Sequence, residues 1–303
     1  MRARRSSSSA VRTVVRLVLA AGFLALAAAA WRARTAPATG YELSIYQGTP
    51  QTVWVAAGVA LGAAVIGLAL SPPGLTRGAG VVLGGGTVLT LVSLPILRGY
   101  AFFGAGDALT HLGWTREIAA GTFAPTSLLY PADHLIAVQT HLLTGIPVTR
   151  ALLLVIPLFT LVYLVFVPLT VRAVDAGRWT VSAAAVGSWL LLPVDHVGVL
   201  LEVYPTTQAL FFVPAILFAL VVYLVRESTV TLPGGVSPFT VLLCALGVAV
   251  VVVHPQQGLN VFVLFAAGAL VQAVAGLWRP GSGVTAHRSL ALPALVVGVA
   301  FVA

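Results

Sequence analysis

The sequence predicts an all-α protein: a polytopic bundle of transmembrane helices, with interfacial amphipathic helices in one long outer loop. Three observations indicate this fold class: 59% of the 303 residues are hydrophobic, only 8% are charged, and the mean hydropathy is +1.03. Soluble domains carry about 25% charged residues, so this chain has too little charge to cover a surface that faces water. Lipid is the solvent that fits such a composition.

Apolar runs recur along the whole chain, so we expect one transmembrane domain rather than several soluble ones. Crossing about 30 Å of hydrocarbon takes about 20 residues, which predicts about nine spans. The spans are expected near residues 14–31, 52–70, 79–97, 151–171, 179–194, 209–225, 239–253, 258–278 and 289–303. Gly58 and Gly62 form a GxxxG pattern in the second span, which predicts close packing against another helix.

The first and the last apolar runs of the sequence each lead to a further expectation. The segment MRARRSSSSAVR and the apolar run after it resemble a signal peptide. Arg32 and Arg34 follow that run at once and more spans come later, so we interpret it as an uncleaved anchor, with cleavage as the alternative. The last run would rise only about 22 Å, short of a full crossing. We therefore expect a longer protein, truncated here at its C-terminus.

The distribution of arginine predicts the orientation. If the N-terminus is cytoplasmic, eleven of the sixteen arginines lie on the cytoplasmic side and five outside, in agreement with the excess of basic residues on cytoplasmic loops. We expect a multi-pass protein of the cell membrane in this orientation. The net charge of +8 does not indicate a nucleic-acid partner, because the arginines are scattered between apolar runs instead of gathering on one face.

With this orientation, most reactive side chains fall on the outer side, including six of the eight acids and five of the six histidines. The long connection, residues 98–150, receives several of them, and a loop of this size in a compact fold is usually functional. It predicts two amphipathic helices, Asp107–Ala120 and Pro131–Leu143. Asp107, His111 and Trp114 share one face of the first helix.

Each of these residues also has a structural interpretation, which stays open at this point. Asp107 and Asp133 are suited to the first turn of a helix. His111, His134 and His141 can be interfacial or buried histidines without a chemical task. An aspartate and a histidine one helical turn apart nevertheless form a pair suited to acid–base chemistry or to contact with a phosphate.

Two other outer segments add candidate substrate contacts. The first, LLPVDHVGVLLEVYPTTQ, contains Asp195 and His196; the second, VVVHPQQGLN, contains His254 and Gln256. Polar residues so close to hydrocarbon tend to line a cavity. No zinc-ligand spacing and no phosphate-binding glycine motif occurs in the sequence. We therefore assign no metal and no cofactor, and a divalent cation lacks support.

The segments GDALTHLGWTREI, LLYPADHLI and HPQQGLN resemble the GT-C superfamily of membrane glycosyltransferases, in its protein-mannosyltransferase-like prokaryotic and archaeal branch. The resemblance covers the architecture of nearly the whole chain, but its motifs are short. The large loop follows the third span here instead of the first, and the acidic pair that binds metal in some relatives is missing.

The resemblance implies a transfer of sugar from a polyprenyl-phosphate donor, a membrane lipid, to a lipid or protein acceptor at the outer face. It implies that Asp107 is the acidic catalytic residue, which acts as general base on the acceptor hydroxyl or orients it, with His111 beside it. Expected substrate contacts are Arg98, Arg116, Asp133, His134, Asp195, His196, His254 and Gln256. Two alternatives remain: a transporter or flippase for lipid-linked glycans, and a non-catalytic membrane subunit of a cell-surface glycan assembly.

Overall fold

The computed structural model describes residues 2–191, 201–225, 232, 237–278 and 288–302. Within these residues the chain is helical and contains no strand. In order, the helices are α1 (Arg2–Arg34), α2 (Ile45–Gly48), α3 (Gln51–Leu70), α4 (Leu75–Val92), α5 (Leu94–Leu97), α6 (Asp107–Ala119), the 3-10 turn η1 (Pro125–Ser127), α7 (Ala132–Thr144), α8 (Val148–Val174), α9 (Arg178–Trp189), α10 (Pro205–Val225), α11 (Pro238–Val253), α12 (Pro255–Trp278) and α13 (Ala291–Val302).

Six helices of the described chain are long and apolar enough to cross a membrane. They are residues Ala10–Arg34 of α1 and the whole of α3, α4, α8, α10 and α12. The prediction of a membrane protein with several spans agrees with this result. The finer expectation of about nine spans is confirmed for these six only.

The remaining three bundle helices are too short to span by themselves. α11 has 16 residues, and α9 and α13 have 12 each. At 1.5 Å per residue they rise about 24 and about 18 Å, less than the hydrocarbon thickness of about 30 Å. α9 ends at Trp189, inside the run 179–194 that the sequence predicts to span, and residues 192–194 lie outside the described part.

The third predicted span, 79–97, is also interrupted. α4 begins earlier, at Leu75, and ends at Val92, and the short helix α5 follows after Ser93. Pro95 lies in the first turn of α5. Because proline has no amide hydrogen to donate to the turn before it, the helix breaks here, and the chain leaves the bundle for the long loop.

Two buried clusters hold the helices together. The larger contains buried residues from α1–α8 and from α10–α13, among them Leu152, Phe211 and Leu243. The smaller joins α1, α3 and α4. The close packing predicted at Gly58 and Gly62 is wrong: both are exposed, and a Cβ atom at either would meet nothing within 4 Å. Gly22 takes that role instead, since its Cβ would lie 2.7 Å from the Cβ of Ala63.

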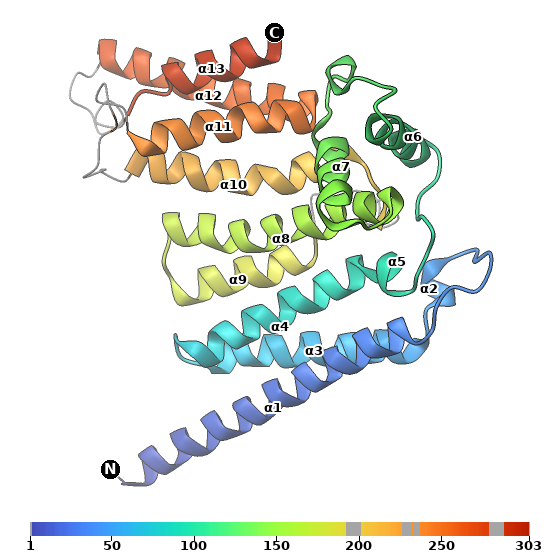
Figure 1. The fold of residues 1–303 in the computed structure, drawn as a ribbon. Helices are drawn as coiled ribbons and strands as arrows, with labels where there is room; N and C mark the ends of the chain where they lie inside the picture. Colours follow the sequence, from blue (N-terminus) through green and yellow to red (C-terminus); the bar gives the residue numbers. More distant parts are fainter. Residues whose placement is uncertain (1, 192–200, 226–231, 233–236, 279–287, 303) are drawn as a thin grey trace.

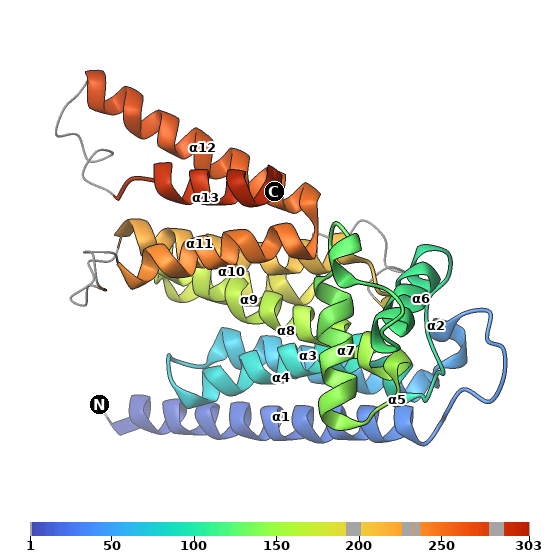
Figure 2. The same cartoon turned by 45° about the horizontal axis from the view of Figure 1, so that its top comes forward.

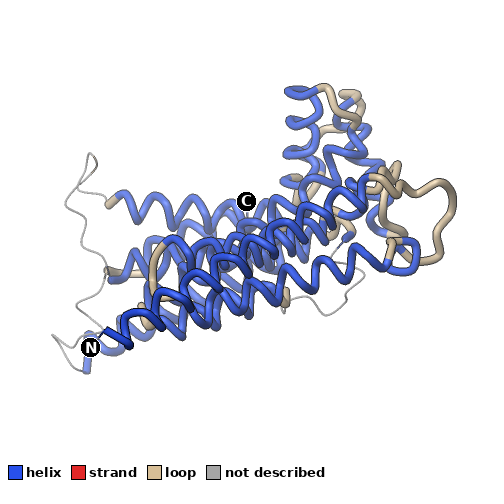
Figure 3. Tube along the Cα trace, turned by 90° about the horizontal axis from the view of Figure 1, so that it is seen from below, coloured by secondary structure: helices blue, strands red, loops and turns tan. Residues whose placement is uncertain are grey.

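The long loop folds over one end of the bundle, where α2, α5, α6 and α7 gather (Figures 1 and 2). Figure 3 shows the same arrangement from below, with short helices standing across that end. α6 and α7 occupy the positions that the sequence predicts for two loop helices, within one residue at each end. Their location at a membrane interface stays a prediction.

The turn between α7 and α8 fixes α7 across the bundle. Gly145 ends α7 in the left-handed region, with φ 73°, and its amide donates to the His141 carbonyl at 2.8 Å. Glycine is the residue that adopts this conformation most readily. Pro147 then precedes the first turn of α8, so the chain reverses within residues 145–147 and α7 packs against the beginning of α8.

Candidate functional site

Three side chains from α6 and α7 form the buried centre of the candidate site. His111 Nδ1 lies 3.3 Å from His134 Nε2, and His134 Nδ1 lies 2.9 Å from Thr115 Oγ1. The Thr115 hydroxyl donates to the His111 carbonyl one turn back, at 2.7 Å. His111, Thr115 and His134 are all fully buried. Buried polar side chains in proteins are nearly always hydrogen-bonded. The contacts among these three side chains therefore link α6 to α7.

The donor and the acceptor of each hydrogen bond in this network follow from counting the available hydrogens. Thr115 has one hydroxyl hydrogen and gives it to the His111 carbonyl, so its oxygen must accept from His134 Nδ1. A neutral His134 then has a lone pair on Nε2, which accepts from His111 Nδ1. The remaining ring nitrogen, His111 Nε2, is therefore left with a lone pair when His111 is neutral.

Burial keeps both rings neutral. It lowers the pKa of His134 to about 4, with a smaller contribution from His111. Burial also lowers the pKa of His111, while the nearby Asp107 carboxylate opposes this shift. Removing an imidazolium from water is unfavourable unless an anion compensates it. His111 has such an anion on one side, and His134 has none among the described residues.

Asp107 faces the free nitrogen of His111 from one helical turn away. Its Oδ2 lies 3.4 Å from His111 Nε2, which otherwise has no bonding partner in the described chain. The Asp107 side chain is 58% exposed, whereas that of His111 is 1% exposed. The solvent-accessible carboxylate of Asp107 therefore lies next to a buried proton acceptor, His111 Nε2. This arrangement can take a proton from an incoming hydroxyl and pass it inward.

Aromatic rings connect this centre to a distant segment of the chain. The ring of Tyr130 lies 5.9 Å from that of His111 and 5.2 Å from that of His254. Trp114 covers the other side, at 5.5 Å from His111 and 5.9 Å from His134. The side chains of Asp107 and His254 are thus at the same end of the bundle, as the sequence predicts.

His254 lies at the junction of α11 and α12 and faces the beginning of α10. Its Nε2 lies 3.1 Å from the hydroxyl oxygen of Thr206, and its buried Nδ1 has no partner in the described chain. Burial, followed by the neighbouring His111, lowers the pKa of His254. One nitrogen of this neutral ring is therefore buried without a partner among the described residues.

A second acid stands near Asp107. The backbone amide of Ala105, two residues before Asp107, donates to Glu202 Oε2 at 3.4 Å. Burial, then Glu202, then Asp107 raise the pKa of the Tyr204 phenol. Tyr204 and Glu202 therefore border the open side of the site. The field there is anionic, because neither carboxylate has a cationic partner among the described residues.

Asp133 is completely buried beside His134, and neither carboxylate oxygen has a partner in the described chain. Burial raises the pKa of Asp133 to about 7. An ionised carboxylate without hydrogen bonds is costly in such surroundings. Because it is completely buried, Asp133 is not accessible to substrate in this structure, although the sequence predicts a substrate contact there.

The two arginines expected to contact substrate lie elsewhere. Arg98 is 2% exposed, and its Nη1 and Nη2 donate to the two carboxylate oxygens of Glu42 at 2.6 Å each. Its Nε donates to the Ala36 carbonyl at 3.1 Å. Arg98 thus holds the connection between α1 and α3. Arg116 is exposed, and at 100° per residue it lies about 180° around α6 from Asp107.

The three remaining residues that the sequence predicts to contact substrate do not all lie within the described structure. Asp195 and His196 lie outside the described residues. Gln256 is exposed in the first turn of α12, whereas its neighbour Gln257 is buried and accepts from Asn260 Nδ2 at 3.0 Å. Among the described residues, no group of three or more acidic, histidine or cysteine side chains is placed to hold a metal ion.

Sequence reasoning missed Thr115, Tyr130 and Thr206, whereas Tyr204 was among the polar residues noted in its segment. A signal for Tyr130 was present, since it precedes Pro131, the N-cap residue of α7. Thr115 follows His111 at the helical spacing of four. Thr115, Tyr130 and Thr206 carry no charge, and an uncharged side chain does not by itself indicate a site in the sequence.

Comparison with known proteins adds no family: no family model, no curated protein and no solved structure matches this chain.

Proposed function

We propose that the chain is a glycosyltransferase of the cell membrane that moves a sugar from a polyprenyl-phosphate donor to a hydroxyl of a lipid or protein acceptor. We place the reaction at the outer face and the N-terminus in the cytoplasm. One observation carries the proposal: the exposed Asp107 carboxylate stands 3.4 Å from the free nitrogen of the buried His111. The resemblance of the surrounding segments to GT-C enzymes supports the choice of substrate class.

In the proposed reaction, the acceptor oxygen attacks the anomeric carbon of the donor sugar. The bond from that carbon to the phosphate oxygen breaks, and polyprenyl phosphate leaves with the electron pair. The hydroxyl proton goes to Asp107, the accessible base, and from there to His111 Nε2. The imidazolium is then stabilised by Asp107 on one side and by His134 Nε2 on the other.

The walls of the site supply the contacts that orient the substrates. Tyr130 and Trp114 offer aromatic faces, on which sugar rings pack well through their apolar C–H surfaces. The Glu202 carboxylate offers acceptors for sugar hydroxyls. Arg98 and Arg116 are left out of the mechanism, because Glu42 holds the first and the second lies across α6 from Asp107.

A transfer assay with a radiolabelled polyprenyl-phosphate sugar tests the proposal. We expect Asp107→Asn and His111→Gln each to lower the rate about 100-fold or more, the range of general acid–base catalysis. Glu117→Gln, an exposed change on the same helix, serves as the matched control and should leave the rate unchanged.

Equal rates for wild type and Asp107→Asn would remove Asp107 from catalysis. The transporter alternative makes a different prediction: labelled donor would move between the leaflets of proteoliposomes without any transfer of sugar. Transbilayer movement without product formation would therefore replace the proposed activity with that alternative.

A further inference from the structure

A groove on the outside of the bundle runs between α4, α8 and α9, far from the candidate site. Its volume is about 470 Å³, and its lining is apolar apart from Arg172. Ligand pockets in proteins commonly have volumes of about 300–1,000 Å³. Val82 and Val165 on its walls are 64% and 41% exposed, so the groove opens to the surroundings of the bundle.

The sequence explains why the helices leave space here. Gly85 and Gly86 present no side chains from α4, and a Cβ at Gly85 would approach nothing closer than Leu164 at 3.9 Å. Pro168 lies inside α8, where a proline bends the helix and removes a backbone bond. α9, with 12 residues against 27 in α8, covers only part of the neighbouring helix.

The groove has the length of one leaflet. Its lining residues on α8 extend from Leu161 to Arg172, which is roughly 16 Å at 1.5 Å per residue. Half of a hydrocarbon core of about 30 Å is about 15 Å. The groove therefore matches the depth to which one acyl chain reaches, and a lipid in it would have its headgroup at the Arg172 end.

Arg172 is available to an anion. Its side chain is exposed and makes no hydrogen bond or ion pair with any described residue. The acid nearest in sequence, Asp175, is occupied: its Oδ1 accepts from the Gly177 amide at 2.8 Å and its Oδ2 from the Thr180 hydroxyl at 2.6 Å. Arg178 at this end is also engaged, donating to the Ala69 carbonyl at 3.0 Å.

We propose that this groove binds an anionic glycerophospholipid, with one acyl chain between α4, α8 and α9 and the headgroup phosphate on Arg172. Guanidinium and phosphate form paired, charge-assisted hydrogen bonds. The site is separate from the proposed catalytic centre. α7, which carries His134, packs near Val148 at the beginning of α8, and Arg172 lies near the other end, about 36 Å away along the helix axis. The binding does not depend on the proposed glycosyl transfer.

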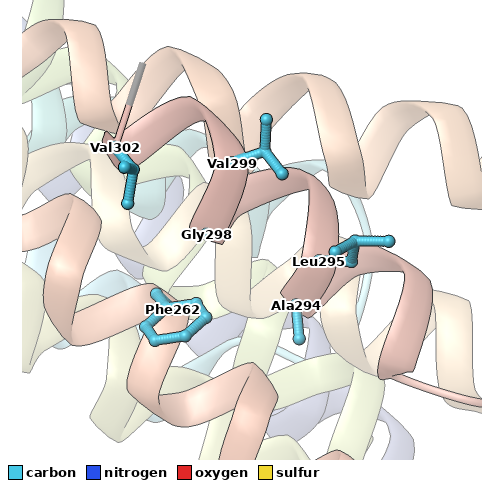
Figure 4. A pocket seen from close by; sticks show the side chains of 6 residues that line it. All are labelled: Phe262, Ala294, Leu295, Gly298, Val299 and Val302. Atoms are coloured by element: carbon cyan, nitrogen blue, oxygen red, sulfur yellow. The ribbon is translucent and has the colours of Figure 1, made fainter.

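A second groove shows why the charge matters. Between α12 and α13, a hollow of about 640 Å³ is lined by Phe262, Ala294, Leu295, Gly298, Val299 and Val302 (Figure 4). All six residues are apolar, so nothing there selects one class of occupant. The groove at Arg172 differs because its single charge complements an anionic headgroup.

The test uses the full chain in nanodiscs of phosphatidylcholine that contain a small fraction of a photoactivatable lipid. The probe is phosphatidylglycerol with a diazirine in its acyl chain, and the comparison lipid is phosphatidylcholine with the same labelled chain. After illumination, mass spectrometry measures the label on the groove-lining peptides of α4, α8 and α9. For wild type we expect about fivefold more label from phosphatidylglycerol, the preference that one arginine gives near a membrane surface.

Five variants separate the effect of the Arg172 charge from the effect of the space in the groove. Arg172→Gln should abolish the preference for phosphatidylglycerol and Arg172→Lys, which keeps the charge but not the paired hydrogen bonds, should retain part of it, whereas Arg150→Gln, at the other end of the same helix, should change nothing. Gly85→Leu should reduce labelling by both lipids, because the new side chain fills the groove. Gly58→Leu is its control, an exposed glycine in another span.

Several results would overturn the proposal. These are an unchanged preference in Arg172→Gln, an equal loss in Arg150→Gln, or label spread evenly over all lipid-facing helices. Elution of each variant as a single species in size-exclusion chromatography checks its folding. If Gly85→Leu fails that check, the comparison of Arg172→Gln with Arg172→Lys decides the question alone.

Discussion

His111 Nδ1 lies 3.3 Å from His134 Nε2, and both rings are buried between α6 and α7. Two neutral imidazoles can share only one hydrogen at such a contact, so the tautomer of each ring determines that of the other. Thr115 fixes His134 through Nδ1, and His134 in turn fixes His111. The consequence is a free Nε2 on His111 that faces Asp107.

Thr115→Val tests whether Thr115 holds this arrangement. Valine has the shape of threonine but cannot accept the hydrogen of His134 Nδ1, which would be left buried and unpaired. We expect the free energy of unfolding to fall by about 1–3 kcal/mol, measured by denaturant titration in micelles. Thr110→Val, an exposed change on α6, should stay within about 0.5 kcal/mol of wild type. Similar losses in both variants would contradict this role.

The sequence predicts the local part of the site well and the distant part poorly. Asp107 and His111 are four residues apart on a helix, so their contact follows from helical geometry alone. The role of Arg98 could not be predicted, because its partner Glu42 lies 56 residues away in another loop. The same holds for Tyr130 and His254, which meet only because α7 crosses the end of α11.

The membrane helices show a similar division. Composition and apolar runs predict where spans lie, and six of the runs form helices long enough to cross. Hydropathy does not predict where a helix ends, because the hydrophobicity of a residue is the same whether its backbone is helical or extended. Ser93 and Pro95 interrupt the third run, and α9 ends at Trp189 although Leu190 and Leu191 continue the apolar sequence.

Glu42→Gln should weaken the fold in a manner that depends on pH. The hydrogen bond from Arg98 lowers the pKa of Glu42 below 4.5. The stabilisation is therefore fully present above pH 4.5 and is lost as the pH falls through the lowered value. At pH 7 we expect Glu42→Gln to be less stable by about 3–5 kcal/mol, since Arg98 stays buried without its anion.

The measurement is the unfolding free energy of both proteins from pH 7 down to pH 3. The difference between wild type and Glu42→Gln should shrink steadily below pH 4.5. The exposed Glu117→Gln should show no such convergence. If the difference in unfolding free energy between the two proteins stays constant with pH, the ionised Glu42 carboxylate does not provide the stabilisation.

Asp133→Asn should have the opposite pH dependence. Burial raises the pKa of Asp133 from 3.8 to about 7, so its protonated form favours the folded state. That contribution is present below pH 3.8 and is lost as the pH rises through about 7. Above pH 7 the asparagine variant should be the more stable one, by on the order of 4 kcal/mol. Unfolding curves at pH 5 and pH 8 measure this, and a wild type as stable as the variant at pH 8 would contradict it.

His111 offers a test that does not require activity. Burial lowers its pKa below 6.5, and the Asp107 carboxylate partly reverses that shift. Because an anion stabilises the imidazolium, Asp107→Asn should lower the pKa of His111 further. NMR titration of the histidine rings in micelles measures the midpoint, with His111→Gln used to assign the resonance. The exposed Glu117→Gln should leave the midpoint in place. If Asp107→Asn leaves it unchanged as well, the two side chains do not interact in solution, and proton transfer between them loses its basis.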